Sequence, residues 1–259
     1  MRSTAILVCC LLVPGFCYAG PFTPGVPQSS ITVSTSATYT GLPSASDSKS
    51  AATGSLSSAA EIPATQPGTF HAWGRANASQ QFTVTDSLIS VQGDTAAKTL
   101  GPPHLIGSAN ADSDTTFVLD FSVNSLSDVI FSYDLLGSIN TIPNSVSRIN
   151  VELTLTGPGV NQHFVANPTY ALNMIASDLY QKHLAGTLPL SLAPGNYSLS
   201  ITQDLNAQGY FFSTESDGNV SSSISASIQA VPEPSGVLPA LVGLSLVGLG
   251  KRARTVHHA

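Results

Sequence analysis

The stretch RINVELTLT, residues Arg148 to Thr156, decides the fold class, because apolar and polar side chains alternate along it without a break. Ile149, Val151, Leu153 and Leu155 fall on one face of an extended chain, and the polar residues between them fall on the other. Antiparallel sheets that bury one face produce this pattern. The stretch therefore predicts an antiparallel β-sandwich or a jelly-roll-like domain.

Similar segments occur along most of the chain and are separated by clusters of Gly, Pro, Asn and Asp. They are Gln81 to Thr85, Ser87 to Val91, Thr115 to Val123, Val129 to Tyr133, His163 to Val165, Tyr197 to Gln203 and Ser221 to Ala230. A helix is expected only over Tyr170 to His183, where Leu172, Ile175, Leu179 and Tyr180 recur at three- and four-residue spacing. Together these segments predict an all-β domain over residues 69–230.

The segment LAPGNYSLSI, from Leu192 to Ile201, predicts a tight turn that leads into a strand. Pro194 presets a turn and Gly195 supplies a positive φ. The segment resembles the turn before a late strand in many extracellular β-sandwich domains, where the Tyr, here Tyr197, packs at a sheet corner. Unrelated functions share this motif, so it bears on the fold alone.

Residues 20–68 are rich in Ser, Thr, Ala and Pro and contain few large apolar side chains. Ile31 to Tyr39 is compatible with one alternating strand. The rest, above all Leu42 to Ala60, offers too little apolar surface to offset the entropy of ordering. We therefore expect residues 20–68 to form a solvated spacer.

The charge of the middle of the chain argues against nucleic acid as a partner. Between Gly20 and Pro234 the sequence contains five Lys and Arg residues and fifteen Asp and Glu residues, which gives a formal net charge of −10. Phosphate binding needs clustered Lys and Arg, and here the basic residues are scattered singly along the sequence. The three cysteines, Cys9, Cys10 and Cys17, all precede this region, so disulfides are not expected to stabilise it.

The first nineteen residues have the anatomy of a signal peptide. A positive start at Arg2 precedes an apolar run, and small residues follow it. Cleavage by signal peptidase is expected after Ala19. A retained membrane helix is disfavoured because the apolar run is short for a hydrocarbon core of about 30 Å. A lipoprotein signal ending at Cys17 is disfavoured by the bulky Phe16.

The C-terminal end combines three parts in a fixed order. Pro232, Glu233 and Pro234 are expected to form an extended peptide, because prolines interrupt both helices and central strands. An apolar run, residues 236–250, follows and predicts a membrane helix. Lys251, Arg252 and Arg254 follow, and we expect them to stop transfer and stay on the cytoplasmic side. A polar tail, residues 255–259, ends the chain.

These three parts resemble the PEP-CTERM sorting signal of exported proteins in Gram-negative bacteria that make exopolysaccharide. The signal spans residues 231–254, with Ala253 interrupting the basic cluster. The resemblance implies processing by exosortase at the Pro232-Glu233-Pro234 region, with transient membrane anchoring and then a cell-surface or extracellular location. It also implies association with exopolysaccharide. An ordinary C-terminal membrane anchor that is never cut is the alternative.

The sequence contains no phosphate loop, nucleophile elbow or zinc-spaced His pair, so we expect no catalytic residues and no cofactor. Asp112 and Asp114 lie in Asn110-Ala111-Asp112-Ser113-Asp114, whose alternating oxygen side chains can in a loop converge on Ca²⁺. The glycine and the distant bidentate Glu of an EF-hand are missing. A polar turn before the Thr115 strand is therefore expected, and Ca²⁺ is expected to leave the melting temperature unchanged.

The leading expectation is a non-enzymatic surface or matrix protein. A glycan-binding module is the first alternative, and it requires an exposed aromatic row on a sheet face or loop rim. The candidate sugar-stacking residues are Trp73, Tyr133, Tyr210, Phe211 and Phe212, although Trp73 suits an anchor at the start of the core equally well. An exported hydrolase is the second alternative, because its carboxylates would meet in space rather than in sequence.

Overall fold

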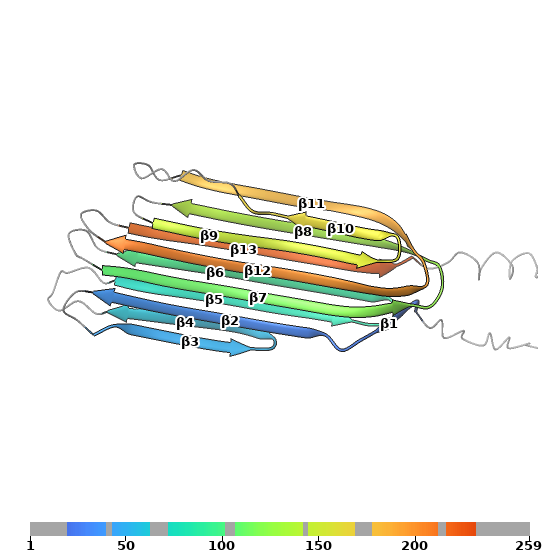
Figure 1. Cartoon of the computed structure of the whole chain (residues 1–259), viewed down its shortest axis with the longest axis horizontal. Helices are drawn as coiled ribbons and strands as arrows, with labels where there is room; N and C mark the ends of the chain where they lie inside the picture. The colour runs from blue at the N-terminus through green and yellow to red at the C-terminus, as the bar shows by residue number, and fades with distance from the viewer. Residues whose placement is uncertain are drawn as a thin grey trace, which may run out of the picture.

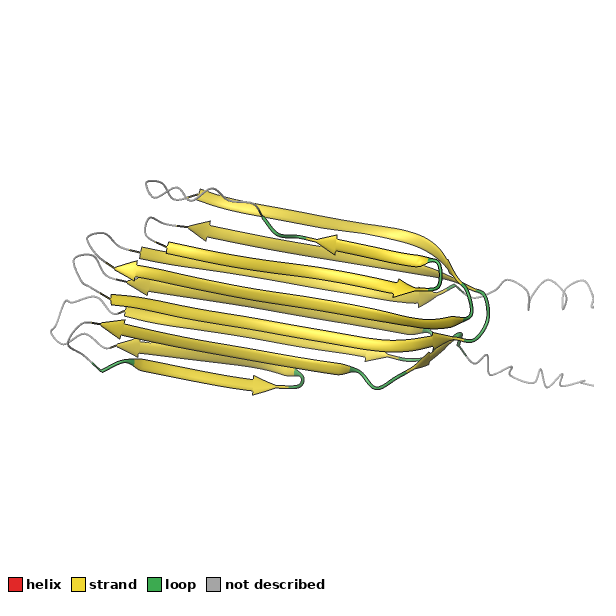
Figure 2. Ribbon diagram, in the orientation of Figure 1, coloured by secondary structure: helices red, strands yellow, loops and turns green. Residues whose placement is uncertain are grey.

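The computed structural model describes residues 20–39, 43–62, 72–101, 107–141, 145–168, 178–211 and 216–231. These residues form thirteen strands and no helix (Figure 2). The strands lie in two antiparallel sheets packed face to face (Figure 1). The predicted all-β antiparallel sandwich is thereby confirmed. The predicted C-terminal helix and signal peptide lie outside the described residues.

Sheet A has the strand order β10-β9-β12-β7-β2-β3, and β1 adds to one end of β7. Its strands are β1 (Phe22–Pro24), β2 (Gln28–Tyr39), β3 (Ala45–Ala51), β7 (Gly107–Val123), β9 (Ser145–Gly157), β10 (Val160–Val165) and β12 (Gly195–Phe211).

Sheet B has the order β11-β8-β13-β6-β5-β4. Its strands are β4 (Gly54–Ile62), β5 (Ala72–Val84), β6 (Leu88–Gly101), β8 (Ser127–Thr141), β11 (Asp178–Leu192) and β13 (Ser216–Ala230).

Most connections switch from one sheet to the other. From β6 onward the chain stays within a sheet only between β9 and β10. Partners within a sheet are therefore often distant in sequence: β13 lies between β6 and β8, and β12 between β7 and β9. Because the paired strands come from all parts of the chain, no short segment can form this fold by itself.

Large apolar side chains fill one half of the space between the sheets. Along β7 the inward-facing residues at this end are Phe117, Leu119, Phe121 and Val123, all buried. Phe117 contacts Phe82 of sheet B with 5.2 Å between ring centroids. We call this the large-residue half, and it is the half in which β1 begins and β13 ends (Figure 1).

In the other half, small side chains line the neighbouring strands β7 and β5, whereas larger residues such as Ile139 and Ile149 fill it toward β8 and β9. The inward-facing residues of β7 there are Ala109, Ala111, Ser113 and Thr115, and the facing strand β5 offers further small residues. At Gly74 of β5 a Cβ atom would lie 2.6 Å from the backbone oxygen of Asn110 in the other sheet. The two backbones approach so closely that only glycine fits. We call this the small-residue half.

A buried hydrogen-bond network joins the two sheets between these halves. The Gln203 side chain of β12 is fully buried. Its Oε1 accepts from Thr115 Oγ1 at 2.8 Å, and its Nε2 donates to Ser222 Oγ of sheet B at 2.9 Å. Ser222 Oγ lies 2.6 Å from Thr95 Oγ1. Because buried polar groups without partners cost about 1–3 kcal/mol each, this network favours one alignment of the sheets.

The predicted turn before β12 is confirmed. Gly195 has a φ of 153°. Tyr197 is buried, its ring stacks on Phe121 with 5.5 Å between centroids, and its hydroxyl donates to the carbonyl of Ala193 at 2.9 Å. This is the sheet-corner role expected for Tyr197.

The predicted spacer is wrong for the described parts of residues 20–68. Residues 20–39 and 43–62 form β1 to β4, and Ile31 and Val33 are fully buried. The prediction failed because it required large apolar side chains, whereas the part of the small-residue half lined by β2, β4, β5 and β7 buries mainly Ala, Gly, Ser and Thr. A compact cluster of Ala37, Ile62, Ala72 and Ala109 illustrates this packing.

Each of the other predicted strands overlaps a strand of the structure, so these predictions are confirmed. Most of the observed strands are longer than predicted. The helix expected over Tyr170 to His183 is wrong for residues 178–183, which belong to strand β11. The rest of that segment lies outside the described residues. In β11, Tyr180 points toward the sandwich interior and Leu179 points outward, which is period-two rather than helical geometry.

Candidate functional site

The residues predicted to direct sorting lie outside the described part of the chain. They are Ala19, Pro232, Glu233, Pro234, Lys251, Arg252 and Arg254. The described residues nearest to them are Gly20 and Val231. Within the described ranges, no helix is both long enough and apolar enough to cross a membrane.

Gly20 and Val231 lie at the same end of the sandwich, beside one turn. The turn joins β5 to β6, and its centre is Asp86 and Ser87. Gly20 N donates to Asp86 Oδ2 at 2.9 Å, and Phe22 N donates to Asp86 O at 2.9 Å. Ala230 N donates to Ser87 O at 2.9 Å. The two ends of the described chain are therefore held by neighbouring residues of one turn.

Asp112 and Asp114 do not lie in a turn, which corrects the prediction. Both belong to the regular strand β7, and they point to the outer face of sheet A because the intervening residue, Ser113, is buried. Residues 110–114 form a strand because the inward-facing side chains, those of Ala111 and Ser113, are small enough for the small-residue half of the core. Its even positions carry the polar side chains toward solvent.

Asp114 lies directly opposite Asp204 of β12. Burial, followed by the charge and hydrogen bond of Asp204 and the charge of Asp112, raises the pKa of Asp114 to about 7. Two carboxylates that face each other repel when both are ionised, so sharing a proton relieves the repulsion. Sequence reasoning missed this pair because Asp204 is ninety residues away along the chain.

Asp112 is surrounded by hydrogen-bond donors from three strands. Its Oδ2 accepts from Ser34 Oγ at 3.0 Å and from Asn110 Nδ2 at 2.6 Å. Its Oδ1 accepts from Asn206 Nδ2 at 2.5 Å. Among the described residues no group of three or more His, Cys, Asp or Glu side chains has an arrangement that could hold a metal ion. The Ca²⁺ expectation stays a prediction.

Two histidines pair with carboxylates on the surface. His163 Nε2 lies 2.5 Å from Glu152 Oε1 on sheet A, and His183 Nε2 lies 2.8 Å from Asp134 Oδ1 on sheet B. All four side chains are substantially exposed. Exposed pairs of this kind contribute about 0–1 kcal/mol, so they add little to the stability of the fold.

Trp73 lies on the outer face of sheet B. It pairs with Leu100 of β6 and with Glu61 of β4, and it is partly exposed. The guanidinium carbon of Arg75 lies 4.6 Å from the Trp73 ring centroid, and Lys98 Nζ lies 5.7 Å from it. Trp73 is therefore an outward-facing residue, and not the core anchor that the sequence also allowed. Sequence reasoning missed the cluster because Lys98 joins it only through the pairing of β5 with β6.

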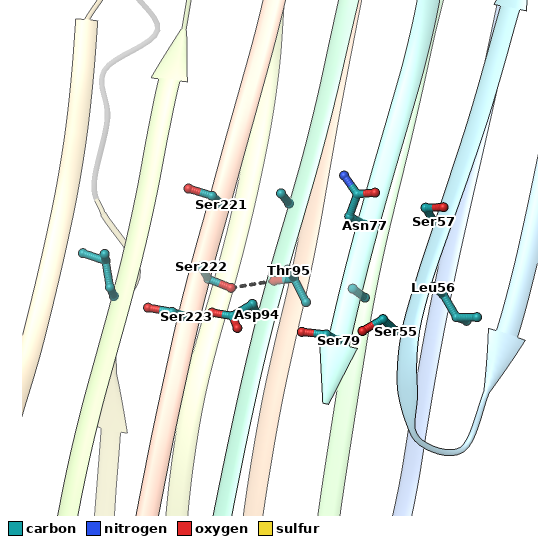
Figure 3. Close-up of a pocket in the computed structure, with 13 residues that line it drawn as sticks. Ser55, Leu56, Ser57, Asn77, Ser79, Asp94, Thr95, Ser221, Ser222 and Ser223 are labelled. Carbon is teal, nitrogen blue, oxygen red and sulfur yellow. Dashed lines mark hydrogen bonds between the residues drawn. The ribbon is translucent and has the colours of Figure 1, made fainter. Parts of the chain in front are cut away.

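A shallow depression begins next to this cluster on the same face of sheet B (Figure 3). It has a volume of about 600 Å³ and is bordered mainly by small polar side chains, including Ser57, Asn77, Ser79, Ser221 and Ser223. A second depression of about 470 Å³ lies further along the face, over β6, β13, β8 and β11. The two depressions offer hydroxyl and amide groups, together with the carboxylates of Asp94 and Asp134 and the apolar side chain of Leu136.

The other sugar-stacking candidates do not form an aromatic row with Trp73. Tyr133 points into the sandwich and stacks on Phe164 with 4.0 Å between ring centroids. Phe212 lies outside the described residues, and nothing is described of the side chains of Tyr210 and Phe211. Among the candidates whose side chains are described, Trp73 alone faces outward.

No family model matches the chain, and no curated protein matches it. Among solved structures, the infectious bursal disease virus VP2 subviral particle aligns at 10% identity, with 90% of each chain covered and a TM-score of 0.16. The structure of the Gx strain of the same virus aligns at 10% identity over 87% of this chain and 90% of that chain, also with a TM-score of 0.16. Scores this low carry no argument about this protein.

Proposed function

We propose that this protein is an exported surface or extracellular-matrix protein, sorted by its C-terminal signal and associated with exopolysaccharide. In this proposal signal peptidase cuts after Ala19, and an exosortase-type enzyme acts at the Pro232-Glu233-Pro234 region. The role of the sandwich is structural and non-enzymatic.

The observation that carries the proposal is the position of the two ends beside one turn. Gly20 and Ala230 bind through their backbone amides to Asp86 and Ser87. A domain that is anchored first by an N-terminal signal and then by a C-terminal helix must present both ends to one membrane. A sandwich with both ends at one pole meets this requirement without rearrangement, and it leaves the opposite pole free to face outward.

Strand content and charge agree with an exported role. The described sandwich buries a continuous core without any cysteine, so the fold does not depend on the redox state of its compartment. The balance of −10 between Gly20 and Pro234 favours solubility after release.

Intact mass spectrometry of the protein from its native host tests the proposal. We expect a mass that lacks the first nineteen residues and everything after the Pro-Glu-Pro region. A mass that retains the C-terminal residues would mean a plain membrane anchor and would overturn the sorting proposal.

A variant with Pro232→Ala, Glu233→Ala and Pro234→Ala sharpens the test. It is expected to keep its C-terminal residues and to stay with the membrane fraction. The matched control is Pro189→Ala with Glu61→Ala, which changes the same residue types at exposed strand positions. The control is expected to be processed like the wild type. Equal processing of both variants would contradict recognition of the motif.

A further inference from the structure

We infer that the outer face of sheet B carries a binding site for an acidic polysaccharide. Trp73 offers a ring face, Arg75 and Lys98 bind the carboxylates of the polymer, and the adjoining depression contacts its hydroxyl groups. This inference rests on the proposed matrix role and names the chemical class of the partner.

Two cations converge on one aromatic ring in this cluster. Arg75 and Lys98 are directly opposite each other on neighbouring strands, where like charges repel. Both charged groups nevertheless lie within 6 Å of the Trp73 ring. Cation–π attraction to the indole holds them there. The result is a compact positive cluster around an aromatic face, and an anionic sugar fits both features.

The charge of the cluster is complementary to that of a sparsely charged polyanion. Only five basic side chains occur between Gly20 and Pro234, and two of them meet at Trp73. Glu61 lies opposite Trp73 on β4, and Asp94 lies two outward positions beyond Lys98 on β6. The positive cluster is therefore small and bounded by carboxylates. It suits spaced single charges, as on an acidic polysaccharide, better than the dense phosphates of a nucleic acid.

The outer face of sheet B continues from the cluster into the depression. The next outward positions after Arg75 and Lys98 are Asn77 and Ala96, and Ser221 of β13 lies opposite Ala96. One strand step further are Ser79, Asp94 and Ser223, which also border the depression (Figure 3). Successive outward positions are about 6.6–6.8 Å apart, so the cluster and the depression form one surface.

The depression is shallow and offers donors and acceptors rather than deep apolar pockets. Short Ser and Asn side chains present hydroxyl and amide groups in rows set by the strand register. Such rows suit the many hydroxyls of a sugar chain. A bound peptide would instead need pockets for its apolar side chains.

The location of the site also suits a displayed protein. Trp73 pairs with Leu100, near the end of the β5–β6 hairpin that is opposite the turn at Asp86 and Ser87. That turn holds the two ends of the described chain. The positive cluster therefore lies at the pole that would face away from the membrane.

The test uses the full-length chain purified in a mild detergent. Binding is measured by affinity electrophoresis and calorimetry with polygalacturonate, with its fully methyl-esterified neutral form, and with a single-stranded oligonucleotide. We expect binding to polygalacturonate and much weaker binding to the other two. Equal binding of the neutral polymer, or tighter binding of the oligonucleotide, would overturn the inference.

Variants assign the binding to the cluster. Trp73→Ala, and separately the double variant Arg75→Gln with Lys98→Gln, are each expected to weaken binding about tenfold or more, as removal of a central contact does. Trp73→Phe should retain part of the affinity. Arg148→Gln, which removes an exposed arginine from sheet A, is the matched control and should bind like the wild type.

Thermal unfolding of each variant checks that the sandwich persists. Unchanged affinity in Trp73→Ala, or an equal loss in Arg148→Gln, would contradict the site. Because binding is measured on purified protein, its failure leaves the sorting proposal standing. Retention of the C-terminal residues in the mass measurement likewise leaves the binding result standing.

Discussion

The two halves of the sandwich reach the same topology with different side chains. In the large-residue half, Phe117 and Phe121 of β7 fill the space between the sheets. In the small-residue half, Ala109 and Ala111 of the same strand do so, and the sheets approach until only glycine fits at position 74. One half depends on apolar volume, and the other depends on close approach of the backbones.

This difference shows that burial and side-chain size are separate requirements. Ala111 is as fully buried as Phe117. Interiors are close-packed, so an alanine layer is stable when the facing strands move inward to meet it. A segment with few large apolar residues can therefore belong to a core, provided that its partners are small as well.

The largest effect is expected from Phe117→Ala in the large-residue half. Removing a fully buried phenyl ring leaves a cavity and should lower the free energy of unfolding by about 3–5 kcal/mol. Urea unfolding of the full-length chain measures this. The contrasting variant is Ala111→Gly in the small-residue half, for which about 0.5–1 kcal/mol is expected. Similar losses in both variants would remove the distinction between the halves.

Gly74→Val tests the close approach of the sheets. The new Cβ would lie 2.6 Å from a backbone oxygen, so the sheets must separate, and a loss of about 1–3 kcal/mol is expected. Gln81→Val, at an outward and exposed position of the same strand, is the control. It should change stability little. If Gly74→Val melts like the wild type, the small-residue half is looser than the structure indicates.

Gln203→Ala tests the boundary between the halves. The change leaves the hydroxyls of Thr115 and Ser222 without their amide partner, so a loss of about 1–3 kcal/mol is expected in chemical unfolding. Gln208→Ala on the outer face of the same strand provides the comparison. The network would be unimportant for stability if the two variants unfolded at the same urea concentration.

The smallest effect is expected from the Asp114–Asp204 pair, because it is partly exposed and solvent screens it. The folded-state pKa of Asp114, about 7, lies above the ordinary value of 3.8, so between these values the native state binds more protons than the unfolded state. Stability should therefore fall as the pH rises from about 4 to 7. Asp204→Asn should flatten this part of the melting profile, whereas Asp120→Asn on the same face should not. A melting temperature that rises over this range in the wild type, but not in Asp204→Asn, would contradict the shared proton.

Some strands were predictable because large apolar residues alternate with polar ones along them, and a strand that buries one face explains this pattern. Arg148 to Thr156 and Tyr197 to Gln203 are examples, and so is the corner at Tyr197. Strands β3 and β4 were not predictable, since Ser, Ala and Gly carry little periodic contrast. The helix expected around Leu179 failed for residues 178–183, because Leu179 and Tyr180, which would share one helical face, lie on opposite faces of strand β11.

The chain by itself determined the fold class and the corner at Tyr197, and it predicts the two terminal signals on which the proposal of export rests. These features are local: they depend on the period of apolar residues, on turn residues and on the order of short segments. Tertiary structure alone decided which strands pair, how closely the sheets approach, and which distant residues share a face. The Asp114–Asp204 pair, the cluster of Arg75 and Lys98 around Trp73, and the meeting of the two ends of the described chain at Asp86 and Ser87 all result from contacts between separate strands. Local sequence does not encode these contacts, because they depend on the packing of the whole sandwich.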